Sequence, residues 1–185
     1  EIIENKQTIY SSKKELPIKI GKDLLWNETW YKTALSHLKI RDSLSYKPEG
    51  GWKDCGSPSQ EVSSHIIMLN ALCDLIELTS NELTKIELQE TYQQIIVGAN
   101  YVALCQDRAK EIGFQEGAVI HEMRNNNKVV TGNVAKTAMI LARISRLIKN
   151  KNPQLAESYL KRSISAYNWI STNGPVLHWE RTDNY

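Results

Sequence analysis

The sequence has little of several features that would define a protein class at once. Its 185 residues include only three cysteines, too few and too widely spaced for a disulfide framework or a paired-cysteine metal site. The net charge is only +2 and the basic residues are scattered, so nucleic acid is not an expected partner. No run of about 18 apolar residues is evident, and we therefore expect no membrane segment. No zinc-ligand spacing or phosphate-binding glycine loop occurs, and we expect neither a metal nor a cofactor.

What is present is typical of a globular helical protein. Hydrophobic residues make up 41% of the chain and charged residues 24%, and the length suffices for one domain with a core. No segment alternates apolar and polar residues for long enough to predict a large sheet. The apolar spacing instead predicts an all-α fold of antiparallel helical hairpins over residues 21–185, after an extended lead-in over residues 1–20.

Five helices are expected from this spacing and from their end signals. Two capping boxes, Ser57 with Gln60 and Thr84 with Glu87, predict two helix starts. Asn152 followed by proline predicts another start, and Asn173-Gly174-Pro175 predicts its end. Within the helices, Cys73, Cys105 and His65 are interpreted as packed core residues. The expected ranges are 22–43, 57–78, 84–106, 133–149 and 153–173.

The segment from Gly50 to Glu61 concentrates the features that suit a polar ligand site. Its glycines form a loop that places Trp52 and Asp54 beside the helix start at Ser57. The free N–H groups and the positive dipole end of that helix would lie close to Asp54. Tryptophan beside a carboxylate is a natural sugar-binding pair. The alternative is an ordinary capped loop between helices, and the spacing alone leaves both interpretations open.

A second long loop precedes the fourth helix and contains His121 and the apolar segment Ala118-Val119-Ile120, a candidate short strand. In toroids of helical hairpins such loops gather at one rim, where sites are usually found. We therefore expect this loop and the Trp52–Asp54 loop to lie at the same end of the molecule.

Gly50-Gly51-Trp52-Lys53-Asp54-Cys55-Gly56-Ser57 resembles the Gly-Gly-Trp-x-Asp-Ala-Gly-Asp signature of glycoside hydrolase family 9, the inverting cellulase-type enzymes. Further segments are similar to that family in the same order and with similar spacing. They are a helix over 95–106, the Gly-Ala-Val-Ile-His segment 117–121, an alanine-containing helix over 131–148 and the Asn-Pro turn at 152–153.

The resemblance implies an (α/α)6 six-hairpin toroid, of which this chain would supply the N-terminal half, and a hydrolase acting on β-linked polysaccharide or oligosaccharide. Asp54 matches the first of two carboxylates that hold and deprotonate the attacking water. Ser57 stands where the second carboxylate, the base, is expected, and serine alone is a poor general base. Trp52 would stack on a sugar ring or pack under the loop. His121 would contact sugar hydroxyls or make a structural hydrogen bond.

The general acid has no counterpart in this comparison. Glu61, Glu116 and Glu122 are available carboxylates, but none matches the family's acid position, and each is interpreted as a solvated or helix-end residue. Cys55 has no evident histidine base and is not expected to be a nucleophile.

Three other functions remain open at this point. The chain is alternatively a non-catalytic glycan-binding relative, another (α/α) sugar enzyme such as an epimerase or lyase, or a purely structural helical domain. By the resemblance alone, its location would be extracellular or periplasmic, although no signal-peptide pattern is visible. A half-toroid would leave an open apolar edge, so we also expect self-association there.

Overall fold

A computed structural model describes residues 2–4, 7–10, 31–54, 59–124 and 127–174 of the chain. The predictions made for Cys55, Ser57 and Pro175 lie outside these residues. The chain divides into two compact units, 1–34 and 35–185, which are described separately.

The first unit contains a short β-hairpin. Strand β1 (Ile2–Glu4) pairs antiparallel with strand β2 (Gln7–Tyr10), and Ile3 lies opposite Thr8. The sequence predicted an extended lead-in here but not the pairing, because strands of three and four residues are too short to show a period. The division between residues 20 and 21 falls outside the described residues and stays a prediction.

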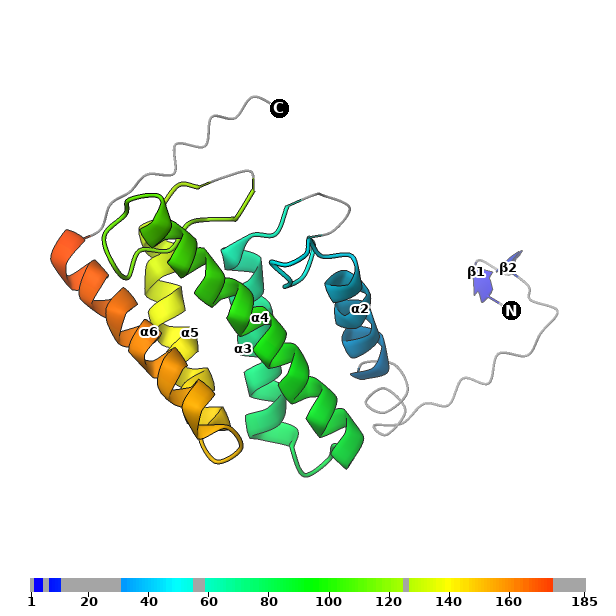
Figure 1. Ribbon diagram of the computed structural model, residues 1–185. Helices are drawn as coiled ribbons and strands as arrows, with labels where there is room; N and C mark the ends of the chain where they lie inside the picture. The colour runs from blue at the N-terminus through cyan, green and yellow to red at the C-terminus, as the bar shows by residue number, and fades with distance from the viewer. Residues whose placement is uncertain (1, 5–6, 11–30, 55–58, 125–126, 175–185) are drawn as a thin grey trace. The chain divides into compact units, whose positions relative to one another are not determined.

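The rest of the described chain is built from helices, as the apolar spacing predicted. Helices α3 and α4 form one antiparallel hairpin, and α5 and α6 form the next (Figure 1). Helices α3 and α5 also contact one another. The helices are α2 (Tyr31–Ser43), α3 (Val62–Thr79), α4 (Lys85–Glu111), α5 (Thr131–Ile148) and α6 (Pro153–Asn173).

Most helix ends are where the end signals placed them. The hydroxyl of Thr84 accepts from the backbone N–H of Glu87, and the Glu87 carboxylate accepts from the Thr84 N–H, which completes the predicted capping box. Asn152 caps α6 by accepting from the Leu155 N–H. The helix ends at Gly174, whose φ of 64° is a conformation that glycine adopts at low cost.

The start predicted for the second helix is wrong. Residues 59–61 are not helical, and α3 begins at Val62 with Glu61 as its N-cap. Gln60 cannot complete a capping box to Ser57, because its side-chain amide accepts from the Tyr46 N–H and donates to the Gly50 carbonyl. The side chain thus holds the preceding loop, and Glu61, the residue before α3, is extended.

Helix α3 lies in the core. Its buried residues pack between α4 and α5, and Cys73 and Cys105 are fully buried, as expected. Burial raises the pKa of the Cys73 thiol to about 12, so it remains protonated and inert at neutral pH.

Helix α3 is also long and apolar enough to cross a membrane. Core helices of soluble proteins often have the same length and composition. The expectation that no membrane is a partner therefore stays a prediction.

An ion-pair network joins α3 to α5 at the surface. The Arg143 guanidinium contacts Asp74 at 2.5 Å and Glu77 at 2.6 Å, and Arg146 also reaches Glu77.

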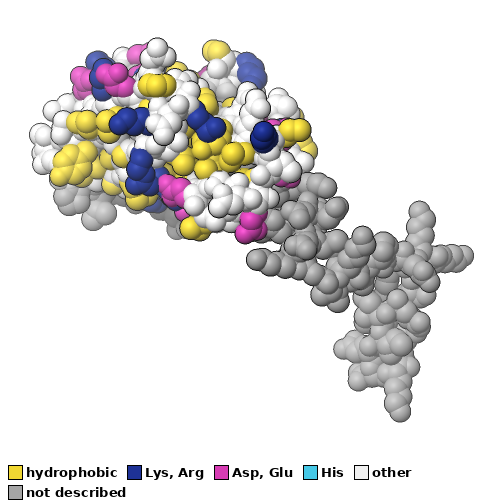
Figure 2. All heavy atoms as spheres, turned by 90° about the horizontal axis from the view of Figure 1, so that it is seen from below, with side chains coloured by type: hydrophobic (Ala, Val, Ile, Leu, Met, Phe, Trp, Pro, Cys, Tyr) yellow, Lys and Arg dark blue, Asp and Glu magenta, His cyan; other side chains and the backbone are white. Residues whose placement is uncertain are grey.

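Apolar side chains lie between Lys and Arg side chains on one face of the molecule (Figure 2). The exposed large apolar residues on helices include Ile67 and Leu78 of α3, Met139 of α5, and Leu160, Ile164 and Tyr167 of α6. Self-association through an open apolar edge stays a prediction.

Candidate functional site

Two loops meet at the end of the bundle where α3 and α5 begin (Figure 1). The backbone N–H of Val62, in the first turn of α3, donates to the carbonyl of His121 at 2.9 Å. The backbone N–H of Gln60 donates to the Glu122 carboxylate at 3.1 Å. The expectation that the Trp52–Asp54 loop and the His121 loop lie together is therefore confirmed.

Asp54 lies beside the start of α3, although that start is at Val62 and not at Ser57 as predicted. Its carboxylate accepts from the backbone N–H of Glu61 at 3.3 Å, and its own N–H donates to the Ser59 carbonyl at 3.0 Å. Its side chain also hydrogen-bonds with Ser64. A small cavity of about 30 Å³ adjoins Asp54 and is also lined by Arg41 of α2. The carboxylate is thus held by the α3 terminus and remains partly exposed.

The environment of Asp54 raises the pKa of its carboxyl above 3.8. Burial is the main cause, and the negative charge of Glu61 adds to it. The Glu61 backbone N–H, the Ser64 hydroxyl and the Arg41 charge act in the opposite direction. A raised pKa makes the carboxylate a stronger base than an ordinary surface aspartate, which suits an interaction with water.

Trp52 packs under the loop rather than facing solvent. It is 3% exposed, its ring stacks on His65 with centroids 5.2 Å apart, and its indole N–H donates to the Gln94 side chain at 2.8 Å. The His65 ring stacks in turn on Tyr101, with centroids 4.3 Å apart. Burial on this scale favours the packing interpretation of Trp52 over the sugar-stacking one.

Two glycines make room for this stack. A β-carbon at Gly51 would lie 2.6 Å from His65 Nε2, and the φ of Gly51, +75°, is also one that other residues rarely adopt. A β-carbon at Gly98 of α4 would lie 2.4 Å from the Trp52 ring. The second glycine of the motif therefore has a structural reason, which is the close approach of the loop to His65 and Tyr101.

His65 is a core residue, as the sequence indicated. Its Nε2 accepts from the backbone N–H of Trp52 at 2.8 Å, and its Nδ1 lies 2.8 Å from the Glu61 carbonyl. These partners fix the neutral tautomer that carries its proton on Nδ1. Complete burial lowers the pKa of His65 from 6.5 to about 4, although the bond to the Glu61 carbonyl partly opposes this.

We predict that His65 makes folding stability depend on pH. The unfolded chain binds a proton at His65 below about pH 6.5 and the folded chain does not until about pH 4, so stability falls as pH decreases through this window. The expected loss is roughly 3 kcal/mol at pH 4. Urea unfolding followed by circular dichroism between pH 4 and 7 measures it. His65→Gln should flatten the pH dependence and the exposed His37→Gln should not; an unchanged slope in His65→Gln would contradict the assignment.

His121 joins the two helix starts. Its side chain is 8% exposed, and its Nδ1 lies 3.0 Å from the amide nitrogen of Asn133 in the first turn of α5. Its Nε2 lies 3.6 Å from a carboxylate oxygen of Glu61. The predicted structural hydrogen bond is present, and a contact with sugar stays a prediction.

Further contacts lock the two loops to one another. The Glu49 carboxylate pairs with Arg124 at 2.8 Å, and Arg124 and Lys53 lie over the ring of Tyr46 at 4.1 and 4.4 Å from its centroid. The hydroxyl of Tyr101 donates to the Gln60 carbonyl at 2.5 Å. These contacts fix the loop that carries Asp54 independently of any ligand.

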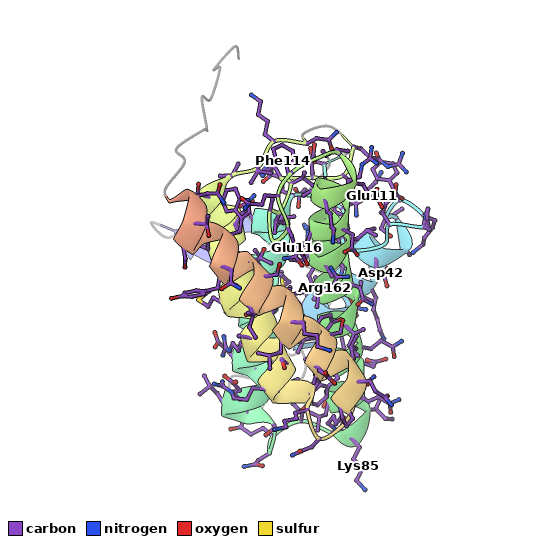
Figure 3. All side chains as sticks on the ribbon, turned by 60° about the vertical axis from the view of Figure 1, so that its left-hand side comes forward. Asp42, Lys85, Glu111, Phe114, Glu116 and Arg162 are labelled. Atoms are coloured by element: carbon purple, nitrogen blue, oxygen red, sulfur yellow. The ribbon has the colours of Figure 1, made fainter. Side chains whose placement is uncertain are left out.

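A larger cavity than the one beside Asp54 lies elsewhere. It has a volume of about 290 Å³ between α4 and α6, where Arg162 pairs with Asp107 at 2.7 Å. Arg162 and Glu116 are labelled there in Figure 3. The cations that line it are paired with carboxylates, and none of its lining residues is aromatic. The cavity therefore lacks the stacking surface that sugars favour, and Asp54 is not part of it.

Two residues at the site were not singled out by sequence reasoning. Asn133 was expected only as a helix start, and its amide instead contacts His121. Glu61 was interpreted as a helix-end residue, which is correct, but its carboxylate also faces His121. Neither contact leaves a local signal, because Asn133 is 12 residues and Glu61 is 60 residues from His121. Within the described ranges, no three His, Cys, Asp or Glu side chains are placed to hold a metal ion.

The helical hairpins match part of a known (α/α)6 toroid. The structure is similar to the crystal structure of a metagenome-derived glycoside hydrolase family 9 endoglucanase, with a TM-score of 0.63 and 19% sequence identity. The similarity covers 73% of this chain and 28% of the endoglucanase chain. No protein-family model and no curated protein matches the sequence. The helical hairpins are thus part of an (α/α)6 toroid, and the chain spans less than a third of its structural neighbour.

Proposed function

We propose that this chain forms part of the catalytic domain of an inverting glycoside hydrolase that acts on a β-linked glucan. One observation carries the proposal. The Gly-Gly-Trp-x-Asp segment places the Asp54 carboxylate at the start of α3, on a fold shared with an endoglucanase. The two loops that meet there hold the polar groups through which a sugar would be bound.

The proposed chemistry follows from the position and basicity of Asp54. A carboxylate of raised pKa that remains partly exposed can accept a hydrogen bond from water and orient it. In inverting hydrolysis this water attacks the sugar from the face opposite the leaving group. His121 borders the same end of the bundle and is proposed to contact sugar hydroxyls. A polysaccharide substrate would place the protein outside the cytoplasm, in the extracellular space or the periplasm.

A second candidate function is glycan binding without hydrolysis. The sequence favours it at one position, because Ser57 stands where the family signature has its second carboxylate. A serine hydroxyl orients water but does not remove its proton at neutral pH. On this alternative, Asp54 and His121 would bind sugar hydroxyls and the bond would remain intact.

The substitution Ser57→Asp separates the two candidates. If the chain is a hydrolase, a carboxylate at this position should raise the rate of reducing-sugar release from a soluble β-glucan by about 10-fold or more. Ser171→Asp, on the exposed face of α6, serves as the control and should not raise the rate. Tight binding of the glucan by calorimetry, with no release of reducing sugar by either variant or by the wild type, would favour the binding candidate.

A further inference from the structure

We propose that Glu61 supplies the second water-holding carboxylate, the general base that position 57 lacks. The inference rests on the proposed function, because it names a further catalytic residue for that reaction. The sequence offered Glu61 only as a solvated residue at a helix end. The structure places its side chain in a different setting.

Glu61 contacts Asp54 through its backbone. The backbone N–H of Glu61 donates to the Asp54 carboxylate, and the negative charge of Glu61 contributes to the raised pKa of Asp54. The two carboxylates are therefore close enough to interact electrostatically. The Glu61 side chain remains 39% exposed, so water and a sugar can reach it.

The contacts of Glu61 orient its carboxylate. One oxygen accepts from the Ser63 hydroxyl at 3.1 Å. The other lies 3.6 Å from Nε2 of His121, whose Nδ1 faces the Asn133 amide. In the tautomer whose Nδ1 accepts from the Asn133 amide, the N–H is on Nε2, the ring atom that lies nearest Glu61. A nearly buried histidine thus lies beside a partly exposed carboxylate, which remains able to contact water.

The other carboxylates at this end already have structural roles. Glu122 is 4% exposed, and its carboxylate accepts a hydrogen bond from the Gln60 N–H. This bond holds the chain that precedes α3 in place. Glu49 pairs with Arg124 and locks the two loops. Glu61 alone among these three glutamates combines exposure with proximity to Asp54.

In the proposed step, a water molecule held by Asp54 and Glu61 loses a proton to the Glu61 carboxylate. At the same time the oxygen of this water bonds to the anomeric carbon. The glycosidic C–O bond breaks, and its electron pair leaves with the leaving oxygen. That oxygen takes a proton from a general acid of the carboxylic class, as in other inverting enzymes.

Hydrolysis of a soluble β-glucan oligosaccharide by Glu61→Gln, with and without sodium azide, tests the role. Glutamine keeps the size of the side chain but cannot take a proton, so kcat should fall about 100-fold. Azide is already an anionic nucleophile and needs no base, so it should restore turnover as glycosyl azide. Glu116→Gln is the matched control, since this exposed glutamate pairs with Lys110 and should leave the rate unchanged. Circular dichroism and the Tm establish that each variant is folded.

The outcomes distinguish the inference from the function on which it rests. A Glu61→Gln variant with kcat within about threefold of wild type, while Asp54→Asn is inactive, would overturn the role of Glu61 and leave the proposed function standing. A folded Glu61→Gln variant that is slow but not rescued by azide would also overturn the base assignment. Absence of turnover by the wild-type chain would overturn the proposed function, and this inference with it.

Discussion

Replacing Asp54 by asparagine is expected to lower the rate of β-glucan hydrolysis at least about 100-fold without unfolding the protein. Asparagine has the shape of aspartate and keeps an oxygen that can accept from the Glu61 N–H, so the loop should remain in place. It removes the charge that binds and orients the attacking water. We therefore expect a loss in kcat rather than in the affinity for the glucan.

The pKa of Asp54 predicts how stability responds to the same change. Because its pKa is raised in the folded protein, the ionised carboxylate is less favourable there than in the unfolded chain, and stability decreases as pH rises above 3.8 through the folded pKa. Asp54→Asn removes this penalty. The variant should be as stable as the wild type, or more stable, at neutral pH, which separates a functional role from a structural one.

The control for Asp54 is Asp42→Asn. Asp42 is an acidic residue of α2 that lies outside the motif and pairs loosely with Lys47 at 3.7 Å (Figure 3). Initial rates of reducing-sugar release, measured across pH for both variants, provide the comparison. Wild-type rates in Asp54→Asn, or an equal loss in both variants, would remove Asp54 from the catalytic role.

The second large effect is expected at Trp52, and it concerns stability. Trp52→Ala should lower the free energy of unfolding by about 3–5 kcal/mol, because it empties the space between His65 and α4. Trp52→Phe keeps an aromatic ring but leaves the Gln94 side chain without its indole donor, and should cost about 1–3 kcal/mol. Urea unfolding at pH 7 measures both.

The same two variants decide between the two interpretations of Trp52. If the ring packs under the loop, the order of stability is wild type, Trp52→Phe, then Trp52→Ala, and folded Trp52→Phe binds glucan as the wild type does. If the ring is a sugar platform, Trp52→Ala weakens glucan binding while the free energy of unfolding stays unchanged. That second outcome would be incompatible with a 3% exposed side chain.

Local signals were sufficient for most of the fold. The helix starts at Thr84 and Asn152 and the end at Gly174 depend on neighbouring residues, and they occur where the sequence placed them. The start of α3 depends on distant residues instead. Gln60 appeared to complete a capping box, but Tyr46 and Gly50 bind its side chain, so a long-range interaction displaced a local one.

The features of the candidate site also differ in whether neighbouring or distant residues determine them. The sequence placed Asp54 beside a helix start at Ser57, whereas its carboxylate accepts from the backbone N–H of Glu61, just before the actual start of α3 at Val62. The burial of Trp52 was not predictable, since it requires Gln94 and Gly98 from α4. The contact between His121 and Glu61 likewise forms only because two loops come together in the folded chain. Composition and residue spacing do not predict this contact.

The central claim is that the end of the bundle around Asp54 belongs to an inverting hydrolase of β-linked glucan. Proton NMR of a β-linked gluco-oligosaccharide mixed with the protein tests it most directly, because the two anomers of the new reducing end give separate signals. We expect the α-anomer to form first and then to equilibrate to the mixture. First formation of the β-anomer, or an oligosaccharide that remains uncleaved, would contradict it.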